Sequence, residues 1–235
     1  MAQCRKPNMK IIAIAMQKGG VGKSTLTRSL AVAATEAGLN VLALDMDTQQ
    51  STSQWKSRRE AALPLVRFTT EIDLPAELER ARKAGCDLVV IDTPPARSTE
   101  APAAVEYSDF VLVPCTADIE AFEQLPRTAR LARTTGKPAA AILTMATPNS
   151  RSEVEIARKV FETVGLDIAP TALHRLKVHR DASRLGQTAQ ELEPNGKAAE
   201  EVRALAAWVF EQVGLGTSAS VQNCTSAHVH KRGAA

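Results

Sequence analysis

Aromatic residues are scarce in this chain and make up 3% of its 235 positions. Its hydrophobic content is nevertheless 44%, so the core must be built mainly from alanine, valine, leucine and isoleucine. A chain of this length can bury a core of that kind within one domain. We therefore expect a single domain with aliphatic packing.

Cysteine is also scarce, and its placement is uninformative as a ligand pattern. The four cysteines are widely scattered and form no CxxC pair; they are Cys4, Cys86, Cys115 and Cys224. This scatter argues against a disulfide framework and against a zinc site of the usual spacing. We expect reduced cysteines in a cytoplasmic protein.

Long apolar runs and a strong net charge are absent as well. No apolar run reaches the roughly 18 residues that a membrane helix needs, and the N-terminus lacks a signal-peptide pattern. The net charge is only +3, so the overall balance does not indicate a strongly basic nucleic-acid-binding protein. These absences predict a soluble protein without membrane attachment, whose contacts with nucleic acid would come from a local patch.

A glycine-rich segment from Gln17 to Thr25 is the most informative feature that is present. It follows the apolar run at residues 11–16 and precedes a helical pattern that begins near Lys23. Such a loop can turn its backbone N–H groups around phosphate oxygens, and the helix N-terminus adds partial positive charge. Lys23 can reach the β- and γ-phosphates, and the Ser24 hydroxyl can bind Mg²⁺. The expected nucleotide-binding residues are Gly19, Gly20, Val21, Gly22, Lys23, Ser24 and Thr25.

Apolar runs alternate with helical patterns along the rest of the chain. The runs are continuous, as expected for strands that are covered on both faces. Further strands are predicted at residues 41–44, 88–91, 110–113 and 139–143, and helices at 23–37, 51–62, 74–84, 118–134, 150–164 and 197–213. This order predicts an α/β fold in which a mostly parallel, twisted sheet is flanked by helices on both faces.

Aspartates stand at the ends of two predicted strands. Asp45 and Asp47 follow residues 41–44, and Asp92 follows residues 88–91. Ligands of open α/β sheets bind beyond the carboxyl ends of the strands, so these carboxylates are expected near the glycine loop. Each aspartate taken alone could be a strand-end cap. The three together favour a Mg²⁺-nucleotide site, in which Asp92 orients water on the metal.

The glycine loop departs from the commonest P-loop at one end. Gln17 stands where the first glycine is usual, and Lys18 follows it. The segment from Lys18 to Thr25 therefore resembles the deviant Walker A motif of the ParA/MinD family of P-loop ATPases. The segment from Asp45 to Gln50 resembles the switch I motif of that family, with Thr48 in place of its proline. The resemblance covers residues 9–213 and points to the small plasmid-partition ParA group that includes ParF.

The resemblance implies a Mg²⁺-dependent ATPase that sandwiches ATP between two identical subunits. Lys18 would cross to the partner's phosphates, and Asp47 would position the attacking water, so these two are the expected catalytic residues. The expected metal residues are Ser24, Asp47 and Asp92. The family's purine-contacting asparagine is replaced by Thr144, so the choice of adenine rests on the resemblance alone. The ParA-like ATPase domain of this chain is expected at residues 9–215, between disordered tails at residues 1–8 and 216–235.

A basic cluster at residues 174–184 includes two histidines, His174 and His179, among its cations. In the family this region lies along the non-specific DNA surface of the dimer; the expected DNA contacts are Arg175, Lys177, Arg180 and Arg184. A solvated basic face is the alternative for such a run. The partition reading also implies a ParB-like centromere-binding partner that stimulates hydrolysis, and a nucleoid-associated location in the cytoplasm.

Other functions remain open. A positioning factor for a non-DNA protein cargo would use the same ATPase chemistry. A redox ATPase like the nitrogenase iron protein would need two cysteines near the switch loops, where only Cys115 is a candidate. Nine residues precede Lys10, so an N-terminal operator-binding domain is not expected. Residues 216–235 have no apolar face, so a membrane-binding helix is not expected there either.

Overall fold

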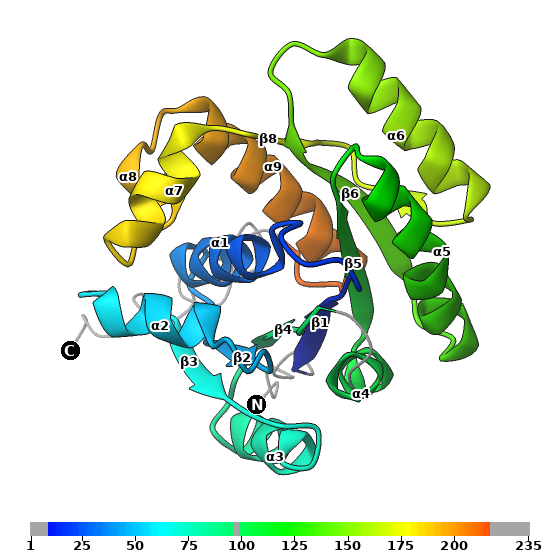
Figure 1. The fold of residues 1–235 in the computed structure, drawn as a ribbon. Coiled ribbons are helices and arrows are strands. Elements are labelled where there is room, and N and C mark those ends of the chain that lie inside the picture. The colour runs from blue at the N-terminus through cyan, green and yellow to red at the C-terminus, as the bar shows by residue number, and fades with distance from the viewer. Residues whose placement is uncertain (1–8, 96–98, 217–235) are drawn as a thin grey trace, which may run out of the picture.

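The computed structural model describes residues 9–95 and 99–216, whose strands form one sheet with helices on both faces (Figure 1). The strands are β1 (Lys10–Ile14), β2 (Val41–Asp45), β3 (Leu65–Phe68), β4 (Leu88–Asp92), β5 (Phe110–Cys115), β6 (Ala139–Ala146), β7 (Asp167–Ile168) and β8 (Leu173–His174). Their order across the sheet is β3-β2-β4-β1-β5-β6-β7, and β8 pairs with the end of β6. All pairs between these strands are parallel. The predicted α/β fold is confirmed.

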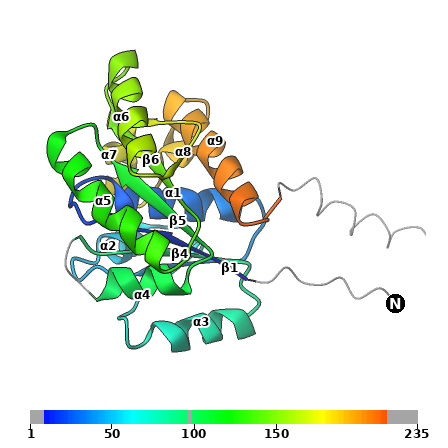
Figure 2. The same ribbon diagram turned by 90° about the vertical axis from the view of Figure 1, so that its right-hand side faces the viewer.

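The helices are α1 (Lys23–Glu36), α2 (Ser51–Arg58), α3 (Leu74–Lys83), α4 (Glu100–Tyr107), α5 (Ile119–Thr134), α6 (Arg151–Thr163), α7 (Lys177–Arg184), α8 (Ala189–Leu192) and α9 (Lys197–Gln212). Helices α1 and α9 pack on one face of the sheet, while α3, α4, α5 and α6 cover the other (Figures 1 and 2). None of the helices in the described ranges is both long and apolar enough to cross a bilayer.

The central strands are apolar throughout because both of their faces are covered. In β1, Ile12 and Ile14 pack in the cluster with α1 and α9, while Ile11 and Ala13 pack in the cluster with α3. Burying one such aliphatic side chain contributes about 1.5–3 kcal/mol. The continuous runs that predicted these strands are therefore a direct result of the three-layer arrangement.

Some predicted boundaries were wrong. The helix predicted at residues 51–62 ends at Arg58, because Arg59 leaves it in an extended conformation. The Arg59 guanidinium instead binds Glu191 on α8, at 2.6 and 2.9 Å. The short elements β3, α4, β7, β8, α7 and α8 were not predicted. The tails predicted at residues 1–8 and 216–235 lie, apart from Gly216, outside the described residues, so the domain limits stay a prediction.

The sheet order brings the carboxyl ends of β1, β2 and β4 together. Asp92 is the register partner of Ile14 in β1 on one side and of Asp45 in β2 on the other. From β1 the chain goes to β2 on one side of the sheet, and it later enters β5 on the other side. A reversal of this kind opens a crevice at the carboxyl edge of an α/β sheet.

Candidate functional site

The loop between β1 and α1 depends on two glycines with left-handed backbone. Gly20 has φ +77° and Gly22 has φ +90°, a region that side chains with a Cβ rarely adopt. Val21 between them is buried, and its carbonyl oxygen accepts a hydrogen bond from Thr144 Oγ1 at 2.8 Å. Thr144 therefore anchors the P-loop to the end of β6, a role that the sequence did not indicate.

Lys23 lies at the mouth of this loop. Only 6% of Lys23 is exposed, and its Nζ donates a hydrogen bond to the carbonyl oxygen of Lys18 at 3.0 Å. Burial lowers the pKa of Lys23, and the carboxylates of Asp92 and Asp47 oppose that shift. Because the side chain is already ordered, the ammonium can bind phosphate without a further loss of side-chain conformational entropy.

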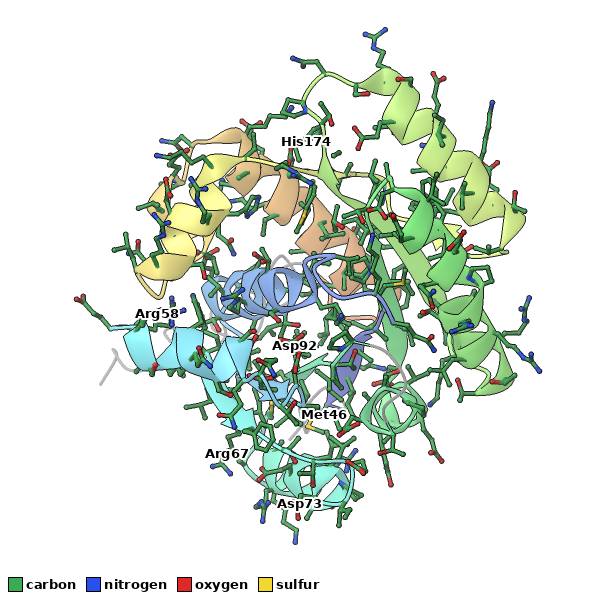
Figure 3. All side chains as sticks on the ribbon, in the orientation of Figure 1. Met46, Arg58, Arg67, Asp73, Asp92 and His174 are labelled. Carbon is green, nitrogen blue, oxygen red and sulfur yellow. The ribbon has the colours of Figure 1, made fainter. Side chains whose placement is uncertain are left out.

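Asp92 is fully buried beneath the loop (Figure 3). Its Oδ2 accepts from Thr52 Oγ1 at 2.7 Å, whereas the buried Oδ1 has no hydrogen-bond partner among the described residues. Burial raises the pKa of Asp92 to about 6, against the hydroxyls of Thr52 and Ser24. A carboxylate with a free oxygen beside a serine hydroxyl suits a hard cation or its water shell.

The two aspartates after β2 have different surroundings. Asp45 is buried, and its Oδ2 accepts from the backbone N–H of Ser53 at 2.8 Å and from Ser53 Oγ at 2.9 Å. Asp45 thus holds the start of α2 in place. Asp47 is only half-buried, and its Oδ1 accepts from the backbone N–H of Gln49 at 2.9 Å. The carboxylate of Asp47 is close enough to Lys23 to affect the pKa of that lysine, and it remains available for a ligand.

The oxygen atoms of Ser24, Asp47 and Asp92 fit Mg²⁺ bound to a nucleotide. In the part of the chain that the structure describes, no three or more His, Cys, Asp or Glu residues gather in a way that suits a metal. Mg²⁺ commonly takes only one or two protein oxygens and completes its shell with phosphates and water. The orphaned Asp92 Oδ1 is the observation that supports this fit.

Lys18 is engaged within its own chain. Its Nζ donates to the Asp118 carboxylate, and Glu120 lies 3.6 Å away. The Asp118 bond raises the pKa of Lys18. Burial acts to raise the pKa of Asp118, but hydrogen bonds from Lys18 and Thr116 hold it well below its ordinary range. Asp118 also caps α5 by accepting from the backbone N–H of Ala121 at 2.9 Å.

The sequence did not single out Asp118, which lies 100 positions after Lys18. Its position after a predicted strand was a signal in the sequence: Asp118 follows the carboxyl end of β5, and the structure shows that β5 pairs directly with β1. Lys18 must leave Asp118 before it can reach a second subunit. The predicted cross-subunit role is therefore tied to breaking this ion pair.

A cavity of about 400 Å³ opens beside the first turn of α1. Its wall is formed by Gly22, Thr25 and Leu26, by the end of β6, by β8 and by α7. The volume lies in the usual range of small-molecule sites. The cavity adjoins the P-loop through Gly22 and Thr25.

Similarity to known proteins agrees with this geometry. The sequence matches the CobQ/CobB/MinD/ParA nucleotide binding domain over residues 12–224. The chain belongs to this family. The family assignment made from the motifs is thereby confirmed.

Three similar proteins of the MinD/ParA type illustrate the relationship. The chain is 33% identical over 200 residues to the Maintenance of carboxysome distribution protein A of Gloeobacter kilaueensis, covering 83% of this chain and 89% of the relative. It is 33% identical over 147 residues to the chromosome-partitioning ATPase Soj of Thermus thermophilus, covering 50% and 59%. The septum site-determining protein MinD of Pyrococcus horikoshii, solved with Mg-ADP, matches the fold with a TM-score of 0.71 at 20% identity, covering 88% of this chain and 98% of that one.

The basic surface expected for a ParA-type protein is only partly as predicted. Its four cations Arg175, Lys177, Arg180 and Arg184 are all exposed. Lys177 pairs with Asp181 at 2.9 Å, and Arg180 and Arg184 lie 3.7 and 3.9 Å from the same carboxylate. Arg175, Arg180 and Arg184 also line the cavity, so they are not separate from the nucleotide region. A role in DNA binding stays a prediction.

The two histidines of the predicted cluster are held differently from its four other cations. His174 is bound to Glu201, and the ring nitrogens of His179 are buried. Burial lowers the pKa of His179, so its ring is disfavoured as a cation. Both histidines are less exposed than the four other cations of the cluster, because Glu201 on α9 holds His174 and the ring nitrogens of His179 on α7 are buried.

Asp92 should give the nucleotide-free protein a distinctive dependence of stability on pH. Its folded-state pKa of about 6 lies above the ordinary 3.8, so the folded protein binds more protons than the unfolded chain between these values. The contribution of Asp92 to stability is therefore present below about pH 4 and is lost as the pH rises through about 6. The total loss is on the order of 2–3 kcal/mol.

Urea unfolding of the parent and of Asp92→Asn, compared from about pH 4 to about pH 7 without Mg²⁺ or nucleotide, tests this expectation. The free energy of unfolding of the variant should rise relative to that of the parent as the pH increases. Parallel pH profiles would show that the ionisation of Asp92 costs the fold nothing.

Proposed function

We propose that the chain is a Mg²⁺-dependent ATPase that positions a protein cargo and uses ATP-dependent dimerisation as its switch. The observation that carries this proposal is the 33% identity to Maintenance of carboxysome distribution protein A, which spans 89% of that relative. The match to the partition ATPase Soj spans 59% of its length. A protein cargo is therefore favoured over the plasmid or chromosome cargo that the sequence resemblance first suggested.

The residues of the site divide the work of hydrolysis between binding and water activation. The P-loop N–H groups and Lys23 bind the phosphates, while Ser24 and Asp92 hold Mg²⁺ directly or through water. Mg²⁺, when bound, neutralises charge on the β- and γ-phosphates. Asp47 orients the attacking water from the exposed side of the loop. The cavity beside Thr25 takes the base.

Dimerisation supplies the missing charge. In the single chain, Lys18 is paired with Asp118 and Glu120. The charged γ-phosphate oxygens of a nucleotide held by a second copy of the chain compete with these carboxylates for the ammonium. Lys18 then stabilises the charge that develops on the partner's transferred phosphoryl group. Hydrolysis removes the γ-phosphate and so weakens the dimer.

We assign DNA the role of a track rather than a cargo. Arg175, Lys177, Arg180 and Arg184 are exposed on and beside α7, and a dimer doubles their number, so weak phosphate contacts add. The protein that stimulates hydrolysis would then belong to the cargo and need not be ParB-like. The ATPase itself, bound to DNA in this way, would be found on the nucleoid in the cytoplasm.

Deletion of the gene in its own host tests the choice of cargo. Plasmids and chromosomes should be inherited at the parental frequency, while a large protein assembly loses its even spacing and clusters, as seen by electron cryotomography. Parent protein and Lys83→Glu should restore the spacing, whereas Lys177→Glu should not. Lys177 and Lys83 are both exposed, neither lines the cavity, and Lys83 lies on α3 across the sheet.

Purified proteins connect this result to DNA. With ATP, the parent and Lys83→Glu should bind DNA of any sequence, and the affinity should fall steeply with salt. Lys177→Glu should bind more weakly although it still dimerises. Loss of a plasmid or chromosome from the deletion strain, with protein assemblies evenly spaced, would instead support partition.

A further inference from the structure

Glu201 on α9 holds both the backbone and the side chain of His174 at the end of β8. Its Oε2 accepts from the backbone N–H of His174 at 3.0 Å, and its Oε1 lies 2.6 Å from His174 Nδ1. Only 8% of Glu201 is exposed, and Lys197 Nζ lies 3.8 Å from Oε1. A carboxylate only accepts, so in the neutral ring it fixes the proton on Nδ1.

The other ring nitrogen is then an acceptor that the fold leaves open. Nε2 of His174 makes no hydrogen bond to any other described residue, and it is not fully buried, so a ligand in the cavity can reach it. His174 lines the cavity that also includes Gly22 and Thr25. Figure 3 shows its side chain between the β8 segment and the helices α1 and α9.

Other side chains of this cavity can also meet a base. Thr144 Oγ1 donates its proton to the carbonyl oxygen of Val21, which leaves its lone pairs free to accept, and the ring nitrogens of His179 are buried without a hydrogen-bond partner among the described residues. Arg175, Arg180 and Arg184 can only donate hydrogen bonds. The hydroxyls of Thr25 and Ser183 can turn to donate or accept. Among the described residues that line the cavity, His174 is the one whose proton position a carboxylate sets.

We propose that His174, positioned by Glu201, accepts a hydrogen bond from the 6-amino group of adenine and so selects adenine over 6-oxo purine nucleotides. The inference rests on the proposed function, namely that the P-loop binds a nucleotide whose base enters this cavity. A 6-oxo purine presents an oxygen at the same position, and two acceptors would then face each other. A site built around one hydrogen bond discriminates well because the wrong ligand leaves a polar group unpaired.

Glu201→Gln is a sharp test because it should reverse the polarity of the ring. The backbone N–H of His174 needs an acceptor, so the single amide oxygen of glutamine must face it. The amide NH₂ then faces Nδ1, which has to accept. The ring proton moves to Nε2, and the cavity gains a donor that suits a 6-oxo group.

The experiment measures the affinities of the parent and its variants for ADP and IDP by calorimetry. These diphosphates differ at the 6-position and avoid hydrolysis. The parent should prefer ADP by about tenfold or more. His174→Ala should lose the preference, and Glu201→Gln should lose or reverse it. Lys197→Met removes the other neighbour of Glu201 and should keep the parental ratio.

The outcomes separate this inference from the proposed function. A parent that binds neither diphosphate contradicts nucleotide binding itself. A parent that binds both equally, or a Glu201→Gln variant with the parental ratio, overturns only the role of His174. If Glu201→Gln does not fold, the ratio for His174→Ala decides, because that change leaves the carboxylate and its backbone hydrogen bond in place.

Discussion

Lys23→Ala should lower the affinity for ADP by about a hundredfold or more, since it removes a charge-assisted contact to the β-phosphate. The ammonium of Lys23 is already buried at the mouth of the P-loop and held there by the carbonyl oxygen of Lys18. Lys23 is the one buried lysine among the described residues, so no other lysine takes over its contact. Calorimetric titration with ADP and Mg²⁺ measures the loss directly.

Lys18→Ala is the matched control in the same loop. It should leave the affinity for ADP within a few-fold of the parent, because Lys18 points to Asp118 and Glu120 rather than to its own P-loop. The same variant should fail to dimerise with ATP, as measured by light scattering. Equal losses of ADP affinity in the two variants would refute a cross-subunit role for Lys18.

Asp47→Ala should slow ATP hydrolysis by about 10²–10⁴-fold and leave a persistent ATP-bound dimer. Asp47 is half-buried, and its carboxylate accepts one hydrogen bond, from the backbone N–H of Gln49, so removal of the carboxylate should spare the fold and the phosphate contacts. Phosphate release and size-exclusion chromatography with ATP and Mg²⁺ test the two halves of the expectation.

Asp45→Ala provides the contrast at the next carboxylate along the chain. Asp45 is buried and accepts hydrogen bonds from Ser53 and from the N–H of Asp47, so its removal should lower the thermal midpoint. An Asp47→Ala variant that stays monomeric with ATP and hydrolyses it at the parental rate would move the catalytic assignment to another residue.

Local chemistry made the central part of the site predictable. Gly20 and Gly22 stand where the loop needs positive φ, and that requirement is a property of single residues. Asp92 was predictable because it directly follows an apolar run, and that run is a strand buried on both faces. The glycine loop, the buried Lys23 and the carboxylate proposed to face the metal could therefore be predicted from the order of residues in the chain.

Contacts between distant segments decided the rest. Arg59 ends α2 early because it binds Glu191, 132 positions further along. Lys18 is paired with Asp118 because β1 and β5 are neighbours in the sheet, and no local pattern expresses that neighbourhood. The exposed edge strand β3 and the two-residue β8 lack a buried run of their own, so their backbone pairing became visible only in the sheet.

By itself, the sequence determined the parallel α/β fold, the P-loop and the family, because these follow from backbone sterics, continuous burial and the spacing of a few side chains. Only the tertiary structure decided that Lys18 is held within its own chain and that Thr144 anchors the P-loop. It also decided that His174 is a bound, cavity-lining ring. These features depend on which helices and which ends of strands lie next to one another in the fold. The residues adjacent to a side chain in the sequence do not indicate its partner from a distant segment.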